Sequence, residues 1–219
     1  MLQEYYDTLA ELNAPSRVSG RVTAKLEMTH TGEFHPAKDE RLGKEDFSKA
    51  ADADGYEIVT DTKGMLLWED DSNSQGPLLI ITSEEVNREY TDYLNRRHIS
   101  WIACGKGSID LKRACEILSE RFGVERMAVV GGGHINAGFL AAGLLDEVSL
   151  LIGAGIDGRG GMAAVFDGLP MERPVPANVK HWHGAKKDSW FSHIAVEVPG
   201  EKCENEWCEP VSEEEYDKL

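Results

Sequence analysis

The segment Val129-Val130-Gly131-Gly132-Gly133-His134-Ile135-Asn136 is the most informative part of this sequence. An apolar strand leads into three consecutive glycines, and a helical pattern starts directly after them. Backbone amides at a helix start, with no Cβ to obstruct them, form an anion site suited to a pyrophosphate. A tight turn between two packed elements would have the same sequence, so both interpretations stay open at this point.

Apolar runs alternate with helical patterns along most of the chain. Strands are expected at residues 17–19, 56–60, 78–82, 99–104, 127–130 and 148–152. Helices are expected at residues 2–13, from Gly20 onward, and at 84–97, 110–122 and 134–142. The polar segment 34–53 is predicted to be a loop. Continuous apolar strands that alternate with helices indicate an α/β fold with a mostly parallel sheet covered on both faces.

Charge and composition narrow the classes of partner. The 219 residues carry a formal net charge of −16, which argues against a nucleic-acid partner because such partners are bound largely by Lys and Arg. The span 127–145 has no formal charge, but its glycines, histidine and asparagine argue against a membrane helix. The first residues show no secretory signal, and the four cysteines form no CxxC pair. We therefore expect a cytoplasmic protein with reduced thiols and no membrane partner.

Two further segments could hold phosphate groups. Gly20-Arg21-Val22-Thr23 is a strand-to-helix turn with an arginine at the helix start, and Ile81-Thr82-Ser83 ends a strand with two hydroxyls. The arginine could form charge-assisted hydrogen bonds, and the hydroxyls could donate to phosphate oxygens. A surface arginine and an ordinary N-cap serine are the alternatives. A Rossmann site fits poorly, because its glycine spacing would need a glycine in place of Asn136.

Together and in this order, the three segments resemble the NADPH-binding pattern of dihydrofolate reductases. The closer match is the RibD C-terminal domain, the reductase domain of riboflavin biosynthesis. Further matching motifs are Asp61-Thr62-Lys63-Gly64 followed by Trp68, His98-Ile99-Ser100, Gly105-Lys106, Ile109-Asp110-Leu111 and Gly143-Leu144-Leu145-Asp146-Glu147-Val148. The resemblance spans about residues 2–167.

The resemblance implies a three-layer α/β/α fold with a mostly parallel mixed sheet, a homodimer, and NADPH as hydride donor. Ser83 would meet the adenosine side of the cofactor, and the glycine turn would meet the pyrophosphate. The full cofactor site implied by the resemblance comprises Gly20, Arg21, Thr23, Thr82, Ser83, Gly105, Gly131, Gly132, Gly133, His134, Ile135 and Asn136.

Two features depart from this family. Its members carry a first strand and a Ser-x-Asp-Gly segment that line the nicotinamide and substrate pocket, whereas here Met1 leads directly into the helix that follows. Such a gap inside the sheet would leave unpaired backbone groups and apolar surface that another element must cover. Riboflavin-pathway reductases also often place a glutamate just before the glycine turn, where this chain has Val130. No catalytic residue is therefore assigned.

The C-terminal part of the chain resembles another family. Residues 175–185, 188–201 and 205–216 are similar to the last strands of a small cupin. The resemblance implies His181 as a metal ligand, but the first cupin motif is missing and three or more ligands are normally needed. We predict a dihydrofolate-reductase-like NADP(H)-binding domain at 1–170 and a cupin-derived segment with an acidic tail at 171–219. Residues 179–185 and 191–198 are predicted to form a β-hairpin that extends the sheet.

Three functions remain open from the sequence. The first is an NADPH-dependent reductase of a small heterocycle, of the pterin or aminopyrimidine type. The second is a nucleotide-binding scaffold that has lost catalysis. The third is metal-dependent cupin chemistry at His181. The cofactor turns favour the first function, and the absent first strand favours the second.

Overall fold

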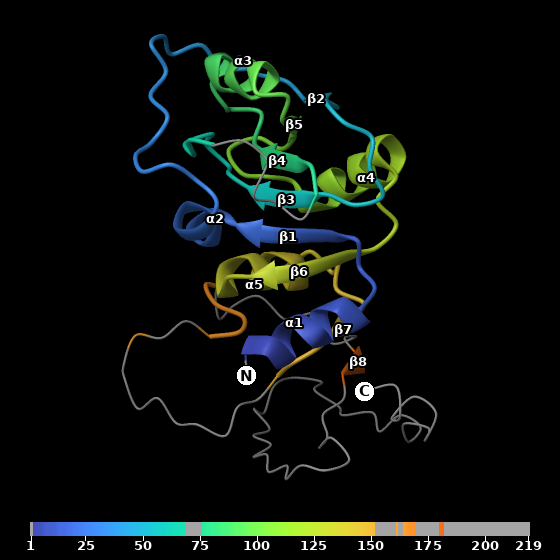
Figure 1. Cartoon of the computed structure of the whole chain (residues 1–219). Coiled ribbons are helices and arrows are strands. Elements are labelled where there is room, and N and C mark those ends of the chain that lie inside the picture. The colour runs from blue at the N-terminus through green and yellow to red at the C-terminus, as the bar shows by residue number, and fades with distance from the viewer. Residues whose placement is uncertain (1, 69–75, 152–160, 162–163, 170–179, 182–219) are drawn as a thin grey trace, which may run out of the picture.

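The computed structural model describes residues 2–68, 76–151, 161, 164–169 and 180–181. Its centre is a six-stranded sheet with the strand order β2-β5-β4-β3-β1-β6 (Figure 1). The strands are β1 (Ser16–Gly20), β2 (Asp46–Ser48), β3 (Glu57–Thr60), β4 (Leu78–Thr82), β5 (Ser100–Ala103) and β6 (Met127–Gly131). Neighbouring strands are parallel except for the antiparallel pair β2 and β5. The expected mostly parallel mixed sheet is confirmed.

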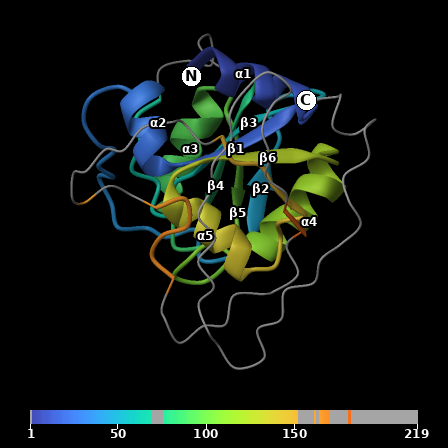
Figure 2. The same ribbon diagram turned by 90° about the horizontal axis from the view of Figure 1, so that it is seen from below.

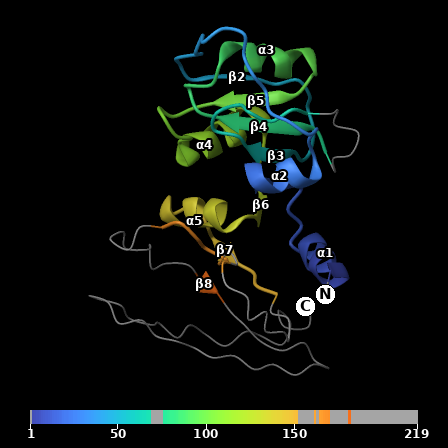
Figure 3. The ribbon, with the colours of Figure 1, turned by 90° about the vertical axis from the view of Figure 1, so that its left-hand side faces the viewer.

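The described residues form five helices. They are α1 (Leu2–Glu11), α2 (Arg21–Glu27), α3 (Arg88–Arg96), α4 (Leu111–Phe122) and α5 (Gly133–Ala141). Figure 2 shows α2 and α3 on one side of the sheet and α4 and α5 on the other, and Figure 3 shows the same layers from the side. The three-layer α/β/α arrangement expected from the sequence is confirmed.

Each face of the sheet has its own hydrophobic core. One core joins α2 and α3 to the sheet through Ala24, Tyr90 and Leu94, together with the fully buried Trp68. The other joins α4 and α5 to the opposite face. All five residues of β4 are buried, which is why that strand is a continuous apolar run in the sequence.

Local signals explain where the longer helices begin and end. The side chain of Asp110 accepts a hydrogen bond from the Arg113 amide at 3.1 Å and caps the start of α4. The helix ends at Gly123, whose φ of 70° is the left-handed conformation that glycine adopts without strain. The helix predicted at 84–97 begins later, at Arg88, because the Asn87 side chain caps the Glu89 amide.

Two sequence predictions were wrong in detail. The polar segment 34–53 is not wholly a loop, because β2 lies within it and pairs with β5 at the sheet edge. A short edge strand with charged neighbours has no apolar run to reveal it. The strand predicted at 148–152 is the two-residue β7 (Glu147–Val148) in its described part, and it lies outside the main sheet.

The strand β7 pairs in parallel with β8 (Lys180–His181) in a separate two-stranded sheet. The predicted C-terminal hairpin otherwise lies outside the described residues, as does the acidic tail. Within the described sheet, β6 pairs with β1 on one side and forms the edge.

Candidate functional site

The strands β1 and β6 lie side by side and run parallel, but the helices that follow them diverge. The chain leaves β1 into α2 on one face of the sheet, and it leaves β6 into α5 on the other face. The carboxyl ends of these two strands therefore form a topological switch point, where open α/β sheets bind their ligands. We refer to this switch point, where the Gly20 turn and the Gly131–Gly133 turn meet, as the crevice.

The glycine turn 131–133 has the geometry that an anion site needs. Gly132 has a φ of 82°, and a Cβ built on it would meet nothing within 4 Å. The first turn of α5 has no side-chain cap. The amides of Ile135 and Asn136 donate to the Gly132 carbonyl, whereas those of Gly133 and His134 have no partner among the described residues. Unpaired amides beside an open glycine can receive a phosphate.

The Gly20 turn packs directly against the glycine turn. A Cβ on Gly20 would lie 3.4 Å from Ile135 Cγ1 and 3.7 Å from the Gly131 carbonyl oxygen. A Cβ on Gly131 would lie 3.5 Å from Thr23 Oγ1. Arg21 is exposed next to these contacts. The structure therefore brings together two of the segments that the sequence singled out, Gly20–Thr23 and the glycine turn.

The described residues contain three buried side-chain oxygens without a hydrogen-bond partner, and all three lie at the carboxyl edge of the sheet. They are Ser19 Oγ at the end of β1, Asp61 Oδ1 directly after β3, and Asn136 Oδ1 in the first turn of α5. Buried polar atoms are nearly always satisfied in folded proteins, so unsatisfied ones call for an explanation. Their common position indicates that this edge of the sheet is built for more than packing.

Asp61 is a buried carboxyl group with one satisfied oxygen. Its Oδ2 accepts hydrogen bonds from the Met65 amide at 2.7 Å, the Leu66 amide at 2.9 Å and the Tyr90 hydroxyl at 3.0 Å. The Tyr90 hydroxyl also accepts a bond from Trp68 Nε1. Burial raises the pKa of Asp61, while these hydrogen bonds and then the charge of Arg21 act against the rise.

The predicted hydroxyl pair consists of Thr82, the last residue of β4, and Ser83, which follows it. Both hydroxyls form hydrogen bonds within the protein. Thr82 Oγ1 donates to the Ile102 carbonyl at 3.4 Å, and Ser83 Oγ donates to the Thr62 carbonyl at 3.0 Å. Both residues are buried. They lie on the same carboxyl edge of the sheet as the crevice, and β3 separates their strand from β1.

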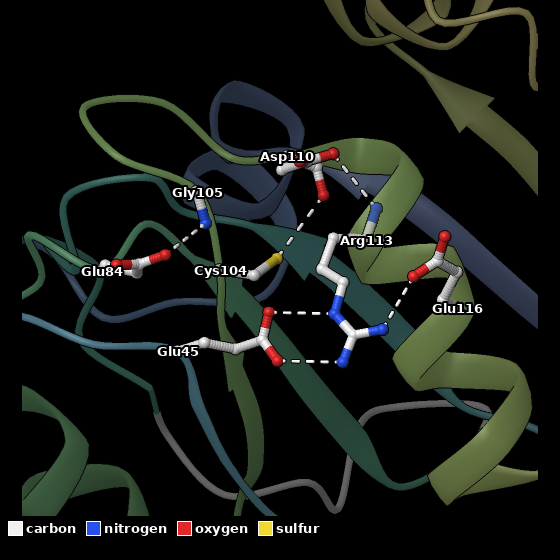
Figure 4. Close-up of polar contacts among 7 residues, drawn as sticks. All are labelled: Glu45, Glu84, Cys104, Gly105, Asp110, Arg113 and Glu116. Carbon is white, nitrogen blue, oxygen red and sulfur yellow. Dashed lines mark hydrogen bonds and ion pairs between the residues drawn. The ribbon is translucent and has the colours of Figure 1, made fainter.

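Gly105 lies further away, at the end of β5. Three strands separate β5 from β6, which places Gly105 about 19 Å from the glycine turn at the usual strand spacing. Its amide donates to Glu84 Oε1 at 3.2 Å (Figure 4). Its φ of 85° and its close approach to the Ser108 carbonyl oxygen, 2.4 Å from a built Cβ, explain why glycine is needed there.

A segment distant in sequence covers one side of the α5 start. The Asp167 amide donates to the Gly133 carbonyl at 3.0 Å, and Asn136 Nδ2 donates to the Val165 carbonyl at 2.8 Å. A cavity of about 400 Å³ lies between this segment, α5 and the start of α4. Its polar lining residues are Asp110, Lys112, His134 and Asp167. His134, which the sequence analysis placed in the cofactor site, therefore lines this cavity.

A second cavity, of about 630 Å³, lies beside α2. Its basic and hydroxyl-bearing lining residues are Arg21, Lys25, Thr29, His30 and Thr31. The Lys25 ammonium is paired with Glu33 at 2.8 Å. Arg21 is thus shared between the crevice and this cavity.

The metal prediction at His181 lies outside the described side chains, although the backbone of His181 belongs to β8. The described residues contain no group of three or more His, Cys, Asp or Glu side chains that could hold a metal ion. No helix in the described part of the chain is long and apolar enough to cross a membrane.

Comparison with known protein families is decisive at this point. The model of the RibD C-terminal domain family matches residues 29–188, which is more than half of the chain. The chain belongs to the RibD C-terminal domain family. Membership implies a reductase-type role in riboflavin biosynthesis, and the six-stranded sheet with its flanking helices fits the dihydrofolate-reductase-like fold. The resemblance to the RibD C-terminal domain inferred from the sequence is thereby confirmed, whereas the cupin resemblance of the C-terminal segment stays a prediction.

Sequence analysis missed two residues of this edge as site candidates. Ser19 lies in a short strand that also contains Ser16 and Arg17, so nothing in the sequence singled it out. Asp61 was noticed as part of a motif but was given no role, although a carboxylate directly after an apolar strand marks the binding edge of a parallel sheet.

Proposed function

We propose that this protein is an NADPH-dependent reductase of a small heterocycle, of the pterin or aminopyrimidine type. The observation that carries the proposal is the open start of α5 at the switch point. There, the unpaired amides of the first turn lie beside an unobstructed Gly132, and Gly20, which precedes Arg21, packs against Gly131 and Ile135. Family membership supplies the reductase class, and the crevice supports a dinucleotide as its cofactor.

The residues present fit a bound dinucleotide. The amides of Gly133 and His134 would receive the pyrophosphate, since they lack partners among the described residues and lie at a helix start. Arg21 and Thr23 would contribute a charge and a hydroxyl from the opposite wall of the crevice. The cavity beside His134 offers room for the adenosine half. When bound, NADPH supplies the hydride for the reduction.

The chain itself contributes binding and orientation. The tight packing of Gly20 against Ile135 and Gly131 holds the two turns in a constant relation. The bonds from Asp167 and Asn136 hold the 165–167 segment against the start of α5, which limits the access of water to that side. Such preorganised donors bind a charged group without first having to rearrange.

A nucleotide-binding scaffold without catalysis is the second candidate. One observation favours it: β6 is an edge strand of the described sheet, so no described strand lies on its outer side. A scaffold would bind the dinucleotide and leave it unoxidised in the presence of any heterocycle.

We also propose a homodimer that works in the cytoplasm. The exposed apolar side chains of Tyr6, Leu150 and Leu151 support a contact with a second copy. Cys104 and Cys115 are free thiols, which agrees with a reducing compartment.

The experiment that tests the proposal is a calorimetric titration of the purified full chain with NADPH, and with NADH in parallel. Tighter binding of NADPH supports the assignment of Arg21 and the glycine turn. The loss of NADPH absorbance is then followed with pterins and aminopyrimidines as candidate substrates. Oxidation with either class supports the reductase. Binding without oxidation by any of them supports the scaffold, and no binding of either nucleotide contradicts both.

A further inference from the structure

We infer that Ser19 is a further ligand-binding residue of the crevice, and that its hydroxyl donates a hydrogen bond to the pyrophosphate of a dinucleotide at the Gly131–Gly133 turn. This inference rests on the proposed function and extends it to a residue outside the predicted site. Three features of β1 and β6 carry it: a buried hydroxyl without a partner, a glycine directly beside it, and an irregularity in the strand pairing.

The hydroxyl of Ser19 is buried and unsatisfied. The residue is 3% exposed, and its Oγ has no hydrogen-bond partner in the described part of the chain. The backbone of the same residue is well bonded, since its carbonyl accepts from Thr60 Oγ1 at 3.3 Å. A buried hydroxyl without a partner destabilises the folded protein, so a serine here is costly unless a ligand completes its bonding.

The hydroxyl lies at the base of the glycine turn. Ser19 is paired with Gly131 across the two strands. A Cβ built on Gly131 would lie 3.7 Å from Ser19 Cβ and 3.5 Å from Thr23 Oγ1. The space above Gly131 is thus bordered by two hydroxyl-bearing side chains and by the start of α5. A phosphate oxygen held by the amides of α5 would face these hydroxyls.

The pairing of β1 with β6 is irregular at this position. Val18 is opposite Val129, but Ser19 is opposite Gly131, so the register shifts by one residue and leaves Val130 as a bulge. Bulges interrupt the hydrogen-bond ladder and are common next to active sites. The irregular pairing thus interrupts the ladder between the two strands directly beside Ser19.

The test compares wild type with Ser19→Ala in the full chain, using NADPH and ADP as probes. ADP carries the diphosphate but lacks the nicotinamide half. We expect both ligands to bind about ten-fold more weakly to Ser19→Ala, the loss typical of one hydrogen bond to a charged group. The Tm of the ligand-free variant should equal or exceed that of wild type, because the substitution removes an unsatisfied buried hydroxyl.

Ser16→Ala is the matched control on the same strand. Ser16 is also fully buried, but its Oγ accepts a hydrogen bond from the Tyr56 amide at 3.1 Å. Removing it leaves that amide unpaired, so Ser16→Ala should lower Tm and leave the affinities for NADPH and ADP unchanged. Ser19→Ala is therefore expected to weaken binding without lowering Tm, and Ser16→Ala is expected to lower Tm without weakening binding.

Each other outcome overturns the inference in a distinct way. A lowered Tm in Ser19→Ala without a change in affinity means that the hydroxyl is structural. Weaker binding of NADPH with unchanged binding of ADP means that Ser19 contacts the nicotinamide half and not the pyrophosphate. Equal affinities of both proteins overturn the ligand contact alone. A wild-type protein that binds no NADPH overturns the proposed function as well.

Discussion

Two turns in this molecule each join a strand to a helix through a glycine with positive φ, but their polar groups differ in hydrogen bonding. They are the β5–α4 turn, with Gly105, and the β6–α5 turn, with Gly132. Both helices start at the carboxyl edge of the same sheet and cover the same face. A comparison of the two shows which features separate a structural turn from a binding turn.

The polar groups of the β5–α4 turn form hydrogen bonds with other residues of the chain. Gly105 donates to Glu84, and Asp110 caps α4 (Figure 4). The Arg113 guanidinium forms two hydrogen bonds to the Glu45 carboxylate at 2.9 Å and a third to Glu116 at 2.7 Å. The Cys104 thiol donates to the Asp110 carbonyl, and burial, followed by the nearby acidic groups, raises its pKa to about 12. That thiol is inert at neutral pH.

The β6–α5 turn keeps unpaired polar groups, although residues 164–167 pack against Gly133 on one side of it. Two amides of α5 and the nearby oxygens of Ser19 and Asn136 lack partners among the described residues. The difference teaches that glycine by itself does not mark a binding turn. A turn binds when the polar groups around it are still unsatisfied after folding.

The largest expected effect is on stability, from Gly105→Ala in the β5–α4 turn. A Cβ there would lie 2.4 Å from the Ser108 carbonyl oxygen and 2.5 Å from the Asp110 amide nitrogen, at a φ of 85°. Backbone strain and overpacking together should cost about 3 kcal/mol or more in the free energy of unfolding. Urea denaturation measures it. A change near zero would mean that the turn can rearrange freely, and the contrast with the β6–α5 turn would disappear.

Gly132→Ala in the β6–α5 turn should lower stability less than Gly105→Ala does, but it should weaken the binding of NADPH. No described atom obstructs a Cβ there, so the cost is the backbone strain of a side chain at a φ of 82° and a ψ of 128°, about 1–3 kcal/mol. The new methyl group would occupy the open side of the turn, and the affinity for NADPH should fall more than about ten-fold, or 1.4 kcal/mol. Calorimetry measures the affinity.

Gly123→Ala is the matched control for that variant. Gly123 has a φ of 70° and nothing within 4 Å of its Cβ position, but it lies at the far end of α4. Its backbone is left-handed helical, with a ψ of 22°, so its cost in unfolding free energy should be no larger than that of Gly132→Ala, while NADPH binding stays at the wild-type level. Equal losses of affinity in both variants would rule out a local role for the glycine turn.

Asp61→Asn should change how stability depends on pH. Because burial holds the folded pKa of Asp61 above its unfolded value of about 4, the contribution of this group is fully present below that value. It is lost as pH rises through the folded pKa. As pH rises above about 4, wild type should therefore lose more stability than Asp61→Asn, whose amide does not ionise. Parallel pH profiles from urea denaturation would contradict the raised pKa.

The smallest effect is expected from Arg113→Ala. The side chains of Arg113 and Glu45 are 38% and 41% exposed, so solvent and salt screen their pairing. We expect Tm to fall by about 2 °C or less, with the difference shrinking further at high salt and NADPH binding unaffected. A large fall, or any loss of NADPH affinity, would show that the β5–α4 turn takes part in binding.

Much of the fold could be predicted because apolar periodicity survives in the sequence. The buried strand β4 is a continuous apolar run, and the caps Asp110 and Gly123 mark the ends of α4. Where apolar patterning was weak, prediction failed. The edge strand β2 lies in a polar segment, and the residues after β7 are apolar yet do not join the main sheet. Edge pairing depends on what lies opposite, which a single sequence does not show.

The candidate site was predicted in part for the same reason. The turns at Gly20–Thr23 and Gly131–Gly133 are local patterns, and the structure places them together. Thr82 and Ser83 match the same family pattern, but folding gives their hydroxyls partners within the protein. The cofactor roles of these residues remain predictions that the titrations above address.

The sequence alone determined the strand-and-helix alternation, the family and the glycine turn, because short-range patterning and motif spacing encode each of them. The tertiary structure alone decided which polar groups stay unsatisfied. Ser16 and Ser19 are two serines of one strand, and nothing in their spacing distinguishes them. One meets the Tyr56 amide from a distant segment, and the other meets no described partner beside Gly131. Hydrogen-bond satisfaction depends on chain segments brought together by folding, and that is where the candidate function of this protein lies.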